Sequence, residues 1–204
     1  MISIAVLASG RGSNFQSIID GVKSGEVDAE IKVLITDNPE AKAIERAKQN
    51  GIPIEIIERK KFKTREEMDL EIKKILDRYK VELAVLAGYM RIIKGKELLE
   101  AYRNKIINIH PALLPAFMGT TDAQKEAFDY GVKISGLTIH FVDESVDAGP
   151  IIYQEAVDIS DCKSADEVSQ KILEREHEAY KKVIDLFSKG EYVVEDKKVK
   201  YVKK

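Results

Sequence analysis

Apolar positions recur along this chain in two patterns. Short apolar runs of strand length alternate with longer stretches in which apolar residues return every three or four positions, as on one face of a helix. The predicted strands are residues 2–8, 31–36, 54–57, 83–87, 106–109, 135–142 and 151–157. The predicted helices are residues 14–24, 41–50, 64–79, 94–102, 121–130 and 164–188. This alternation predicts an α/β fold, a doubly wound, mostly parallel sheet with helices on both faces.

Two segments carry more specific signals. Thr64 and Glu67 have the spacing of a capping box in front of the third predicted helix. The last segment, residues 192–202, alternates apolar residues with lysines and predicts a hairpin at the edge of the sheet. Because no repeat or linker interrupts the chain, we expect one domain over residues 1–204.

Composition excludes several classes of function. The chain has 204 residues, a hydrophobic content of 44% and a net charge of -2, so bulk charge does not indicate a nucleic-acid partner. Cys162 is the only cysteine and the three histidines lack ligand spacing, so neither a disulfide nor a metal site is expected. No apolar run approaches the roughly 20 residues of a membrane span, and the N-terminus lacks the charged start of a signal peptide. We therefore expect a cytoplasmic protein.

The run 107–115 places an amide and an imidazole at the end of a predicted strand. Asn108 and His110 are two positions apart, so their side chains face the same side, and Pro111 ends the hydrogen-bond ladder there. The later loop 143–150 offers carboxylates that could orient and charge the imidazole. An amide that binds an oxygen and an imidazole that moves a proton indicate acyl or formyl chemistry.

Two other segments leave alternatives open. The turn 9–14 follows a strand and opens a helix, so it could bind a phosphate, or it could be a plain turn with Ser13 or Asn14 as helix cap. It lacks the motifs for ATP or NAD. Residues 87–93 could line a slot for a flat heterocycle, or connect two elements with Met90 in the core. For His140 we expect a core or supporting role, and for His177 a packing or solvated one.

Four motifs occur in order along the chain: Ser-Gly-Arg-Gly-Ser-Asn from residue 9, Ala-Gly-Tyr-Met-Arg-Ile from 87, Asn-Ile-His-Pro-Ala-Leu-Leu-Pro from 108 and His-Phe-Val-Asp-Glu-Ser-Val-Asp-Ala-Gly-Pro-Ile-Ile from 140. With them the chain resembles the phosphoribosylglycinamide formyltransferases, folate-dependent enzymes of purine biosynthesis, over essentially its whole length. The resemblance implies a Rossmann-like formyltransferase fold. It also implies transfer of a formyl group from 10-formyltetrahydrofolate to the amine of glycinamide ribonucleotide, without a metal, by a monomer or homodimer.

The resemblance also implies residue roles. The catalytic residues would be Asn108, His110 and Asp147, with Asp147 raising the pKa of His110. The substrate phosphate would lie on the backbone of Gly12, Ser13 and Asn14, and Glu176 would bind the ribose hydroxyls. The residues that would hold the folate are Arg65, Met90, Arg91, Ile92, Ile93, Asn108, Asp143, Glu144, Ser145, Val146 and Asp147.

Two departures limit what the resemblance implies. The loop 116–122 lacks the proline and histidine common in the family, so no contacts are assigned to it. Leu173 replaces a more polar residue that some members have beside the substrate site.

Two competing functions remain. One is another folate-dependent formyl enzyme, such as a formyl-folate hydrolase or an enzyme that formylates transfer RNA. We expect such an enzyme to carry an extra domain, for which 204 residues leave no room. The other is a non-catalytic nucleotide-binding module, which retention of the three catalytic residues disfavours.

Overall fold

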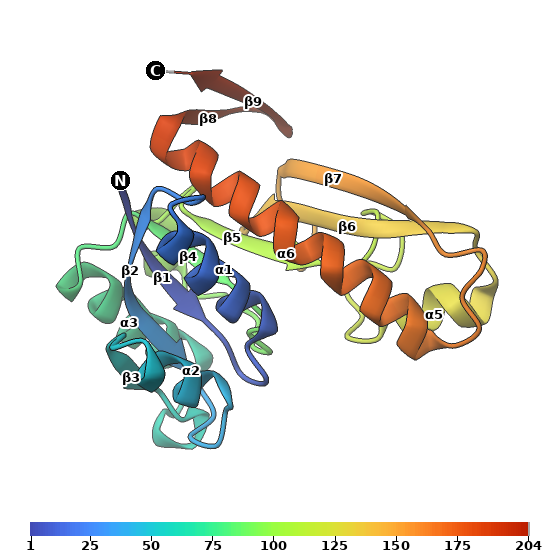
Figure 1. Ribbon diagram of the computed structural model, residues 1–204. Coiled ribbons are helices and arrows are strands. Elements are labelled where there is room, and N and C mark those ends of the chain that lie inside the picture. The colour runs from blue at the N-terminus through green and yellow to red at the C-terminus, as the bar shows by residue number, and fades with distance from the viewer. Residues whose placement is uncertain (204) are drawn as a thin grey trace.

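A computed structural model describes residues 1–203 and shows a central sheet with helices on both faces (Figure 1). The strands are β1 Ile2–Leu7, β2 Ala29–Thr36, β3 Ile54–Ile56, β4 Leu83–Leu86, β5 Ile106–His110, β6 Ile134–Phe141, β7 Ile151–Asp158, β8 Gly190–Glu195 and β9 Lys198–Lys203. The helices are α1 Ser13–Ser24, α2 Ala43–Gln49, the 3-10 helix η1 Arg59–Lys61, α3 Arg65–Arg78, α4 Lys96–Ala101, α5 Ala123–Tyr130 and α6 Ala165–Lys189. Every predicted element is present with boundaries that differ by a residue or two, whereas η1 was not predicted.

The strands form one sheet in the order β3-β2-β1-β4-β5-β6-β7-β9-β8. Strands β1 to β5 run parallel, β6 pairs antiparallel with both β5 and β7, and β9 runs parallel to β7. Strand β8 pairs antiparallel with β9 and forms the edge, as the lysine-rich hairpin predicts. The predicted α/β fold with a mostly parallel, doubly wound sheet is confirmed.

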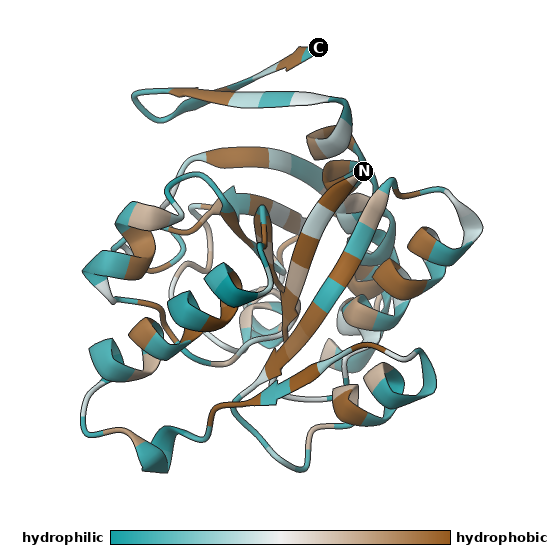
Figure 2. Cartoon of the chain, turned by 90° about the vertical axis from the view of Figure 1, so that its left-hand side faces the viewer, coloured by the Kyte–Doolittle hydropathy of each residue, from teal (hydrophilic) through white to brown (hydrophobic). Residues whose placement is uncertain are grey.

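The period of two along the strands divides the core into two layers. Ile4 and Val6 of β1 pack with residues of α1, α2, α5 and α6 on one face of the sheet. Ala5 and Leu7 pack with α3 and α4 on the other face. Figure 2 shows the resulting pattern, in which apolar residues concentrate on the strands and on the inner sides of the helices. Because both faces are covered, the central strands are apolar at consecutive positions.

Helices α3 and α1 begin in different ways. Thr64 caps α3, with its hydroxyl 3.1 Å from the backbone N–H of Glu67, and the Glu67 carboxylate completes the capping box. Helix α1 instead begins after Gly12, whose left-handed φ of 67° suits glycine, and neither Ser13 nor Asn14 caps it. A Cβ atom on Gly12 would lie 2.9 Å from that of Ala43, so the turn also needs glycine for the close approach of α2.

The strand order places a crevice at the carboxyl ends of the central strands. Strand β1 lies between β2 and β4, so the connections that leave its two sides diverge. Ligands of open α/β sheets bind at such a switch point. Among residues 1–203 no helix is both long enough and apolar enough to cross a membrane.

Candidate active site

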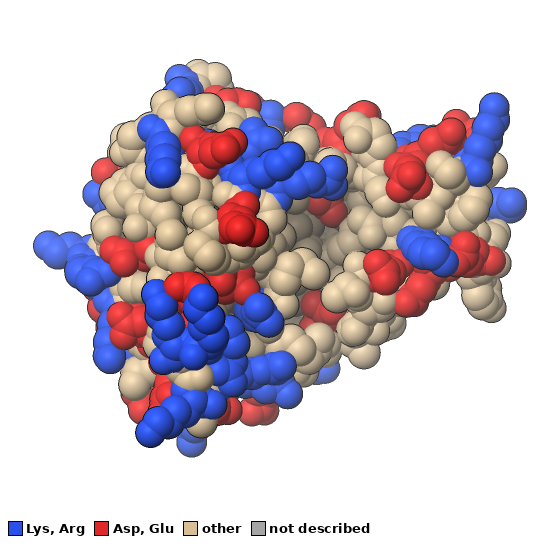
Figure 3. Space-filling view, turned by 90° about the horizontal axis from the view of Figure 1, so that it is seen from below, with Lys and Arg blue, Asp and Glu red and all other residues tan. Residues whose placement is uncertain are grey.

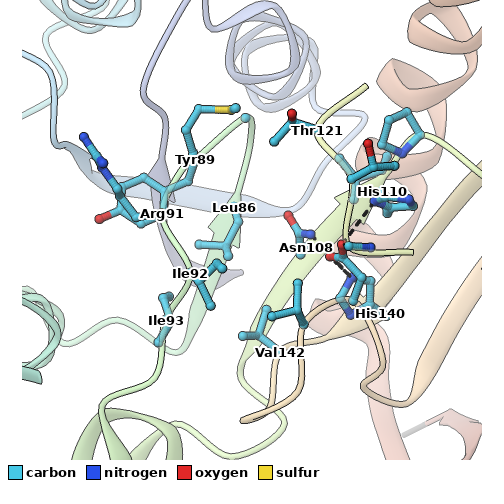
Figure 4. Close-up of a pocket in the computed structure, with 18 of the residues that line it drawn as sticks. Leu86, Tyr89, Arg91, Ile92, Ile93, Asn108, His110, Thr121, His140 and Val142 are labelled. Carbon is cyan, nitrogen blue, oxygen red and sulfur yellow. Dashed lines mark hydrogen bonds and ion pairs between the residues drawn. The ribbon is translucent and has the colours of Figure 1, made fainter. Parts of the chain in front are cut away.

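A cleft of about 470 Å³ opens at this switch point, a size that suits a small-molecule ligand. It is visible as the hollow near the centre of Figure 3, and Figure 4 shows its walls. Its lining residues come from the β4–α4 connection, the end of β5, the loop after Gly119 and the loop after β6, together with Arg11, Asn14 and Glu176. Segments that are far apart in sequence therefore meet in one site.

Strand β5 brings Asn108 and His110 to the same wall of the cleft, as their spacing predicts. The His110 side chain is almost fully buried, and its Nε2 lies 2.9 Å from the carbonyl oxygen of Phe117. Because a carbonyl oxygen only accepts hydrogen bonds, Nε2 carries the proton in this contact. The other ring nitrogen, Nδ1, lies 3.5 Å from Oδ2 of Asp147. Nδ1 is thus the nitrogen that can gain and lose a proton.

Asp147 contacts both histidines of the cleft. Its Oδ1 lies 3.7 Å from Nε2 of His140, and its Oδ2 accepts a hydrogen bond of 3.2 Å from the backbone N–H of Gly119. Its backbone has a left-handed φ of 53°, which is uncommon outside glycine and turns the side chain toward β5 and β6. Figure 4 shows His110, Asn108 and His140 next to one another. The predicted catalytic residues therefore converge.

His140 contacts both Asn108 and Asp147. It lies opposite Asn108 in the antiparallel β5–β6 register, and its Nδ1 donates to the Phe141 carbonyl at 2.9 Å. While the ring is neutral, its Nε2 can accept from the Asn108 amide, whose Nδ2 lies 3.4 Å away, and when the ring is charged the same nitrogen can donate to Asp147. This contact orients the Asn108 amide, so His140 supports Asn108.

The charge states of His110 and Asp147 depend on their burial and on their contacts with each other. Desolvation lowers the pKa of His110 below its usual range, while Asp147 and the Phe117 carbonyl oppose the shift. The predicted contribution of Asp147 has the expected direction, but the net shift is opposite because burial outweighs it. The contact with His140 lowers the pKa of Asp147 most, burial opposes it, and the charge of His110 adds to the lowering. A neutral imidazole thus lies beside an ionised carboxylate at neutral pH.

The β4–α4 connection forms the opposite wall. Met90 and Ile92 are 62% and 40% exposed, so the alternative that places Met90 in the core is wrong. Arg91 lines the cleft, but its guanidinium pairs with Asp37, Nε to Oδ2 at 2.6 Å, and points away from Asn108 and His110 (Figure 4). The wall is therefore made by backbone and apolar side chains. The apolar side chains of this wall are Leu86, Met90, Ile92 and Ile93, and Val142 from the loop after β6 also lines the cleft.

The acidic loop supplies only part of its predicted set. Asp143, Ser145, Val146 and Asp147 line the cleft, whereas Glu144 lines a second cavity beside α4. Asp143 accepts hydrogen bonds of 2.8 Å from the backbone and the hydroxyl of Ser145, which shape the loop. Arg65 begins α3 and is not among the residues that line the cleft.

The end of the cleft nearest α1 is polar. Asn14 Nδ2 donates to Oε2 of Glu176 at 2.8 Å, and both side chains are buried. Burial raises the pKa of Glu176 to about 7, opposed by the Asn14 hydrogen bond. Asn14 Oδ1 has no hydrogen-bond partner within residues 1–203. Gly12 and Ser13 belong to the same turn but are not among the residues that line the cleft. Asn14 and Glu176 are the predicted substrate residues that reach it.

Several lining residues were missed from the sequence. Arg11, Thr121, Gln124 and His140 all line the cleft. The signal for Arg11 was its place between two glycines after a strand, and the signal for His140 was a histidine at the end of an apolar strand. Nothing in the local sequence singles out Gln124. Among residues 1–203 no group of three or more His, Cys, Asp or Glu residues is placed to bind a metal ion.

Comparison with known proteins matches residues 2–184 to the family described as formyl transferase. Phosphoribosylglycinamide formyltransferase of Bacillus subtilis is 46% identical over 184 residues, which are 90% of this chain and 93% of that protein. The trifunctional purine biosynthetic protein adenosine-3 of Gallus gallus is 37% identical over 93% of this chain, which corresponds to 19% of that protein.

Solved structures agree with the sequence relatives. Glycinamide ribonucleotide transformylase 1 from Symbiobacterium toebii has a TM-score of 0.94 and 40% identity, and the match covers 99% of this chain and 94% of that one. Phosphoribosylglycinamide formyltransferase from Bacillus halodurans has a TM-score of 0.86 and 41% identity, with 91% and 94% covered. The chain belongs to the formyl transferase family and, within it, to the phosphoribosylglycinamide formyltransferases.

Proposed function

We propose that this chain transfers the formyl group of 10-formyltetrahydrofolate to the amino group of glycinamide ribonucleotide, a step of purine biosynthesis. One observation carries the proposal. Asn108, His110 and Asp147 meet in the middle of a cleft that has an apolar wall on one side and a polar end beside α1 on the other. Membership of the family supports the same reaction.

The two ends of the cleft fit two different ligands. The wall around Ile92 and Val142 offers a flat apolar surface next to backbone groups, which suits the pteridine ring of the folate. The N-terminus of α1 has no acidic residue in its first turn and suits a phosphate. Glu176 has one hydrogen-bond donor, Asn14, and its carboxyl group suits the ribose hydroxyls.

Asn108 stabilises the charge that develops during the transfer. When the amine nitrogen forms its bond to the formyl carbon, the carbonyl electron pair moves onto the oxygen. The amide N–H of Asn108 donates to that oxygen from a position fixed by His140, 3.4 Å away. Because the donor is already oriented, little reorganisation accompanies the reaction.

His110 and Asp147 move the proton. The neutral Nδ1 of His110 accepts the proton that the attacking amine loses, and Asp147, 3.5 Å away, stabilises the imidazolium that forms. The tetrahedral intermediate then collapses, the bond between the formyl carbon and the folate nitrogen breaks, and that nitrogen receives the proton. In sum the amine loses one proton, the folate nitrogen gains one, and the formyl group changes its carrier.

A competition assay tests the proposal. The purified chain is incubated with 10-formyltetrahydrofolate and offered glycinamide ribonucleotide, a transfer RNA and water as acceptors. We expect formylated glycinamide ribonucleotide to form in step with tetrahydrofolate, and Asn108→Ala to lower kcat by roughly 10²-fold to 10³-fold. Tetrahydrofolate release without a formylated acceptor would indicate a hydrolase. Formylated transfer RNA would indicate the other transferase, and binding without turnover would indicate a nucleotide-binding module.

We further propose that the enzyme works in the cytoplasm as a single-domain monomer or homodimer, with no nucleic-acid or membrane partner. The near balance of 33 basic and 35 acidic residues supports the absence of a nucleic-acid partner. Light scattering at several protein concentrations measures the oligomeric state directly.

A further inference from the structure

Arg11 is a cation at the polar end of the cleft to which the sequence analysis assigns no role. It lies between Gly10 and Gly12 in the turn that joins β1 to α1, it is exposed, and it lines the same cleft as Asn14. Among the salt bridges within residues 1–203, none involves the Arg11 guanidinium. The side chain is therefore available to a ligand.

A second arginine, Arg46, donates a hydrogen bond to the backbone of this turn. Arg46 of α2 donates from Nε to the carbonyl oxygen of Arg11 at 2.9 Å and from a terminal nitrogen to Oε1 of Gln16 at 3.0 Å. Both acceptors are neutral, so the charge of Arg46 is not compensated by them. The backbone N–H of Ala43, also in α2, donates to the Gly10 carbonyl at 3.2 Å and fixes the turn further.

These groups concentrate positive charge at one place. The N-terminus of α1 carries the positive end of the helix dipole, with no acidic residue in its first turn and no side-chain cap. Two guanidinium groups beside it repel one another and the helix end unless an anion is bound. The polar end of the cleft is therefore suited to an anion.

Asn14 gives an independent sign that a ligand binds here. Its side chain is 7% exposed and lines the cleft, yet its Oδ1 has no partner in the part of the chain that the structure describes. A buried carbonyl oxygen without a donor costs free energy, and a hydroxyl or amine of a ligand would supply that donor. The expected ligand thus combines an anion with hydroxyl or amine groups, as a sugar phosphate does.

We propose that the Arg11 side chain binds the phosphate of the acceptor and that Arg46 is a positioning residue that fixes the Arg11 backbone for this contact. The inference rests on the proposed function, in which the N-terminus of α1 receives that phosphate. It adds a guanidinium group, whose planar donor pair matches two phosphate oxygens, to recognition by backbone N–H groups alone.

The test compares two acceptors that differ only in the phosphate: glycinamide ribonucleotide and the corresponding riboside. For Arg11→Gln we expect KM for the ribonucleotide to rise roughly 10-fold to 100-fold, the scale of a lost charge-assisted hydrogen bond. KM for the riboside and for the folate should stay as in the wild type. Lys42→Gln is the matched control, because Lys42 is an exposed cation before α2 that is not among the described cleft-lining residues.

Arg46→Gln separates positioning from direct contact. It should raise KM for the ribonucleotide by less than Arg11→Gln does, and the double variant should show less than the product of the two effects, because both act on one contact. Calorimetric titration with inorganic phosphate and with glycinamide ribonucleotide gives Kd values that do not depend on turnover. We expect Arg11→Gln to weaken both by a similar factor.

The outcomes separate the two proposals. An equal rise of KM for both acceptors in Arg11→Gln would mean that Arg11 shapes the turn rather than binding phosphate. An unchanged Kd for inorganic phosphate and for the ribonucleotide would overturn the inference even if the enzyme is fully active. A wild-type chain that binds the ribonucleotide through Arg11 but forms no formylated product would instead contradict the proposed function.

Discussion

Replacement of Glu176 by glutamine should stabilise the ligand-free enzyme at neutral pH. Burial raises the pKa of this carboxyl to about 7 from an ordinary value of 4.5. That difference corresponds to about 3 kcal/mol of unfavourable free energy once the group is ionised in the folded chain. A glutamine side chain at this position would carry no charge, and its amide oxygen could still accept the hydrogen bond of 2.8 Å that Asn14 donates to Glu176.

The sign of the pH dependence follows from proton linkage. Between about pH 4.5 and pH 7 the folded wild-type chain keeps a proton on Glu176 that the unfolded chain has lost. The unfolding free energy of the wild type therefore falls as pH rises through this window. The advantage of Glu176→Gln should be near zero at pH 4.5, grow through the window and level off near 3 kcal/mol above pH 7.

Urea unfolding of both proteins at several pH values measures this difference. Glu174→Gln is the control, because Glu174 lies on the same helix but is exposed, so its replacement should change stability by less than about 0.5 kcal/mol at every pH. An advantage of Glu176→Gln that is the same at pH 4.5 and pH 8, or a loss of stability at pH 8, would refute the reasoning. The variant should also bind glycinamide ribonucleotide less tightly, because a carboxylate accepts from both ribose hydroxyls.

Three further changes test other parts of the site. His110→Ala and Asp147→Asn should each lower kcat roughly 10²-fold to 10⁴-fold, and a double variant slowed by the full product would contradict a shared proton function. Asp37→Asn should raise KM for the folate several-fold, because Arg91 loses a partner 2.6 Å away and belongs to the wall that suits the folate. KM for the acceptor should not change, and Asp129→Asn, at an exposed position, is the control. Gly149→Ala should lower the free energy of unfolding by about 1 to 3 kcal/mol, because the new Cβ would lie 1.9 Å from the Phe141 carbonyl oxygen. Gly10→Ala is the control, because a Cβ there would have no atom within 4 Å, and urea unfolding measures both.

The sequence was sufficient for the fold because periodicity and burial agree in this chain. Consecutive apolar positions in β1 and β4 correspond to strands covered on both faces, and the capping box at Thr64 marks the start of α3 within one residue. Helix α1 differs, because its start depends on a close approach between Gly12 and Ala43 that only the folded chain contains. Local patterns predict local elements, whereas contacts between α1 and α2 have no local signature.

The sequence predicted the central residues of the candidate site, but not all of its lining and not its electrostatics. The spacing of Asn108 and His110 fixed their common face, and the loop to Asp147 was placed correctly beside them. The charge of His110 depends on how deeply it is buried, which the sequence does not state, and so the direction of its pKa shift was predicted wrongly. The outward turn of Arg91 likewise depends on Asp37, a residue 54 positions away along the chain.

Some of the buried polar atoms without a hydrogen-bond partner belong to residues of the cleft. Among residues 1–203 five buried side-chain atoms have no hydrogen-bond partner: Asn14 Oδ1, Asp37 Oδ1, Tyr89 Oη, Ser135 Oγ and His177 Nε2. Asn14 and Tyr89 line the cleft and Asp37 pairs with Arg91, whereas Ser135 and His177 do not line it. Each such atom lowers the stability of the ligand-free chain, because water is lost and no protein donor or acceptor replaces it. The buried carboxyl of Glu176 adds a larger cost at neutral pH. The costs at Asn14, Tyr89 and Glu176 fall on residues that line the cleft, so ligands that supply the missing hydrogen-bond partners would offset them and stabilise the folded chain.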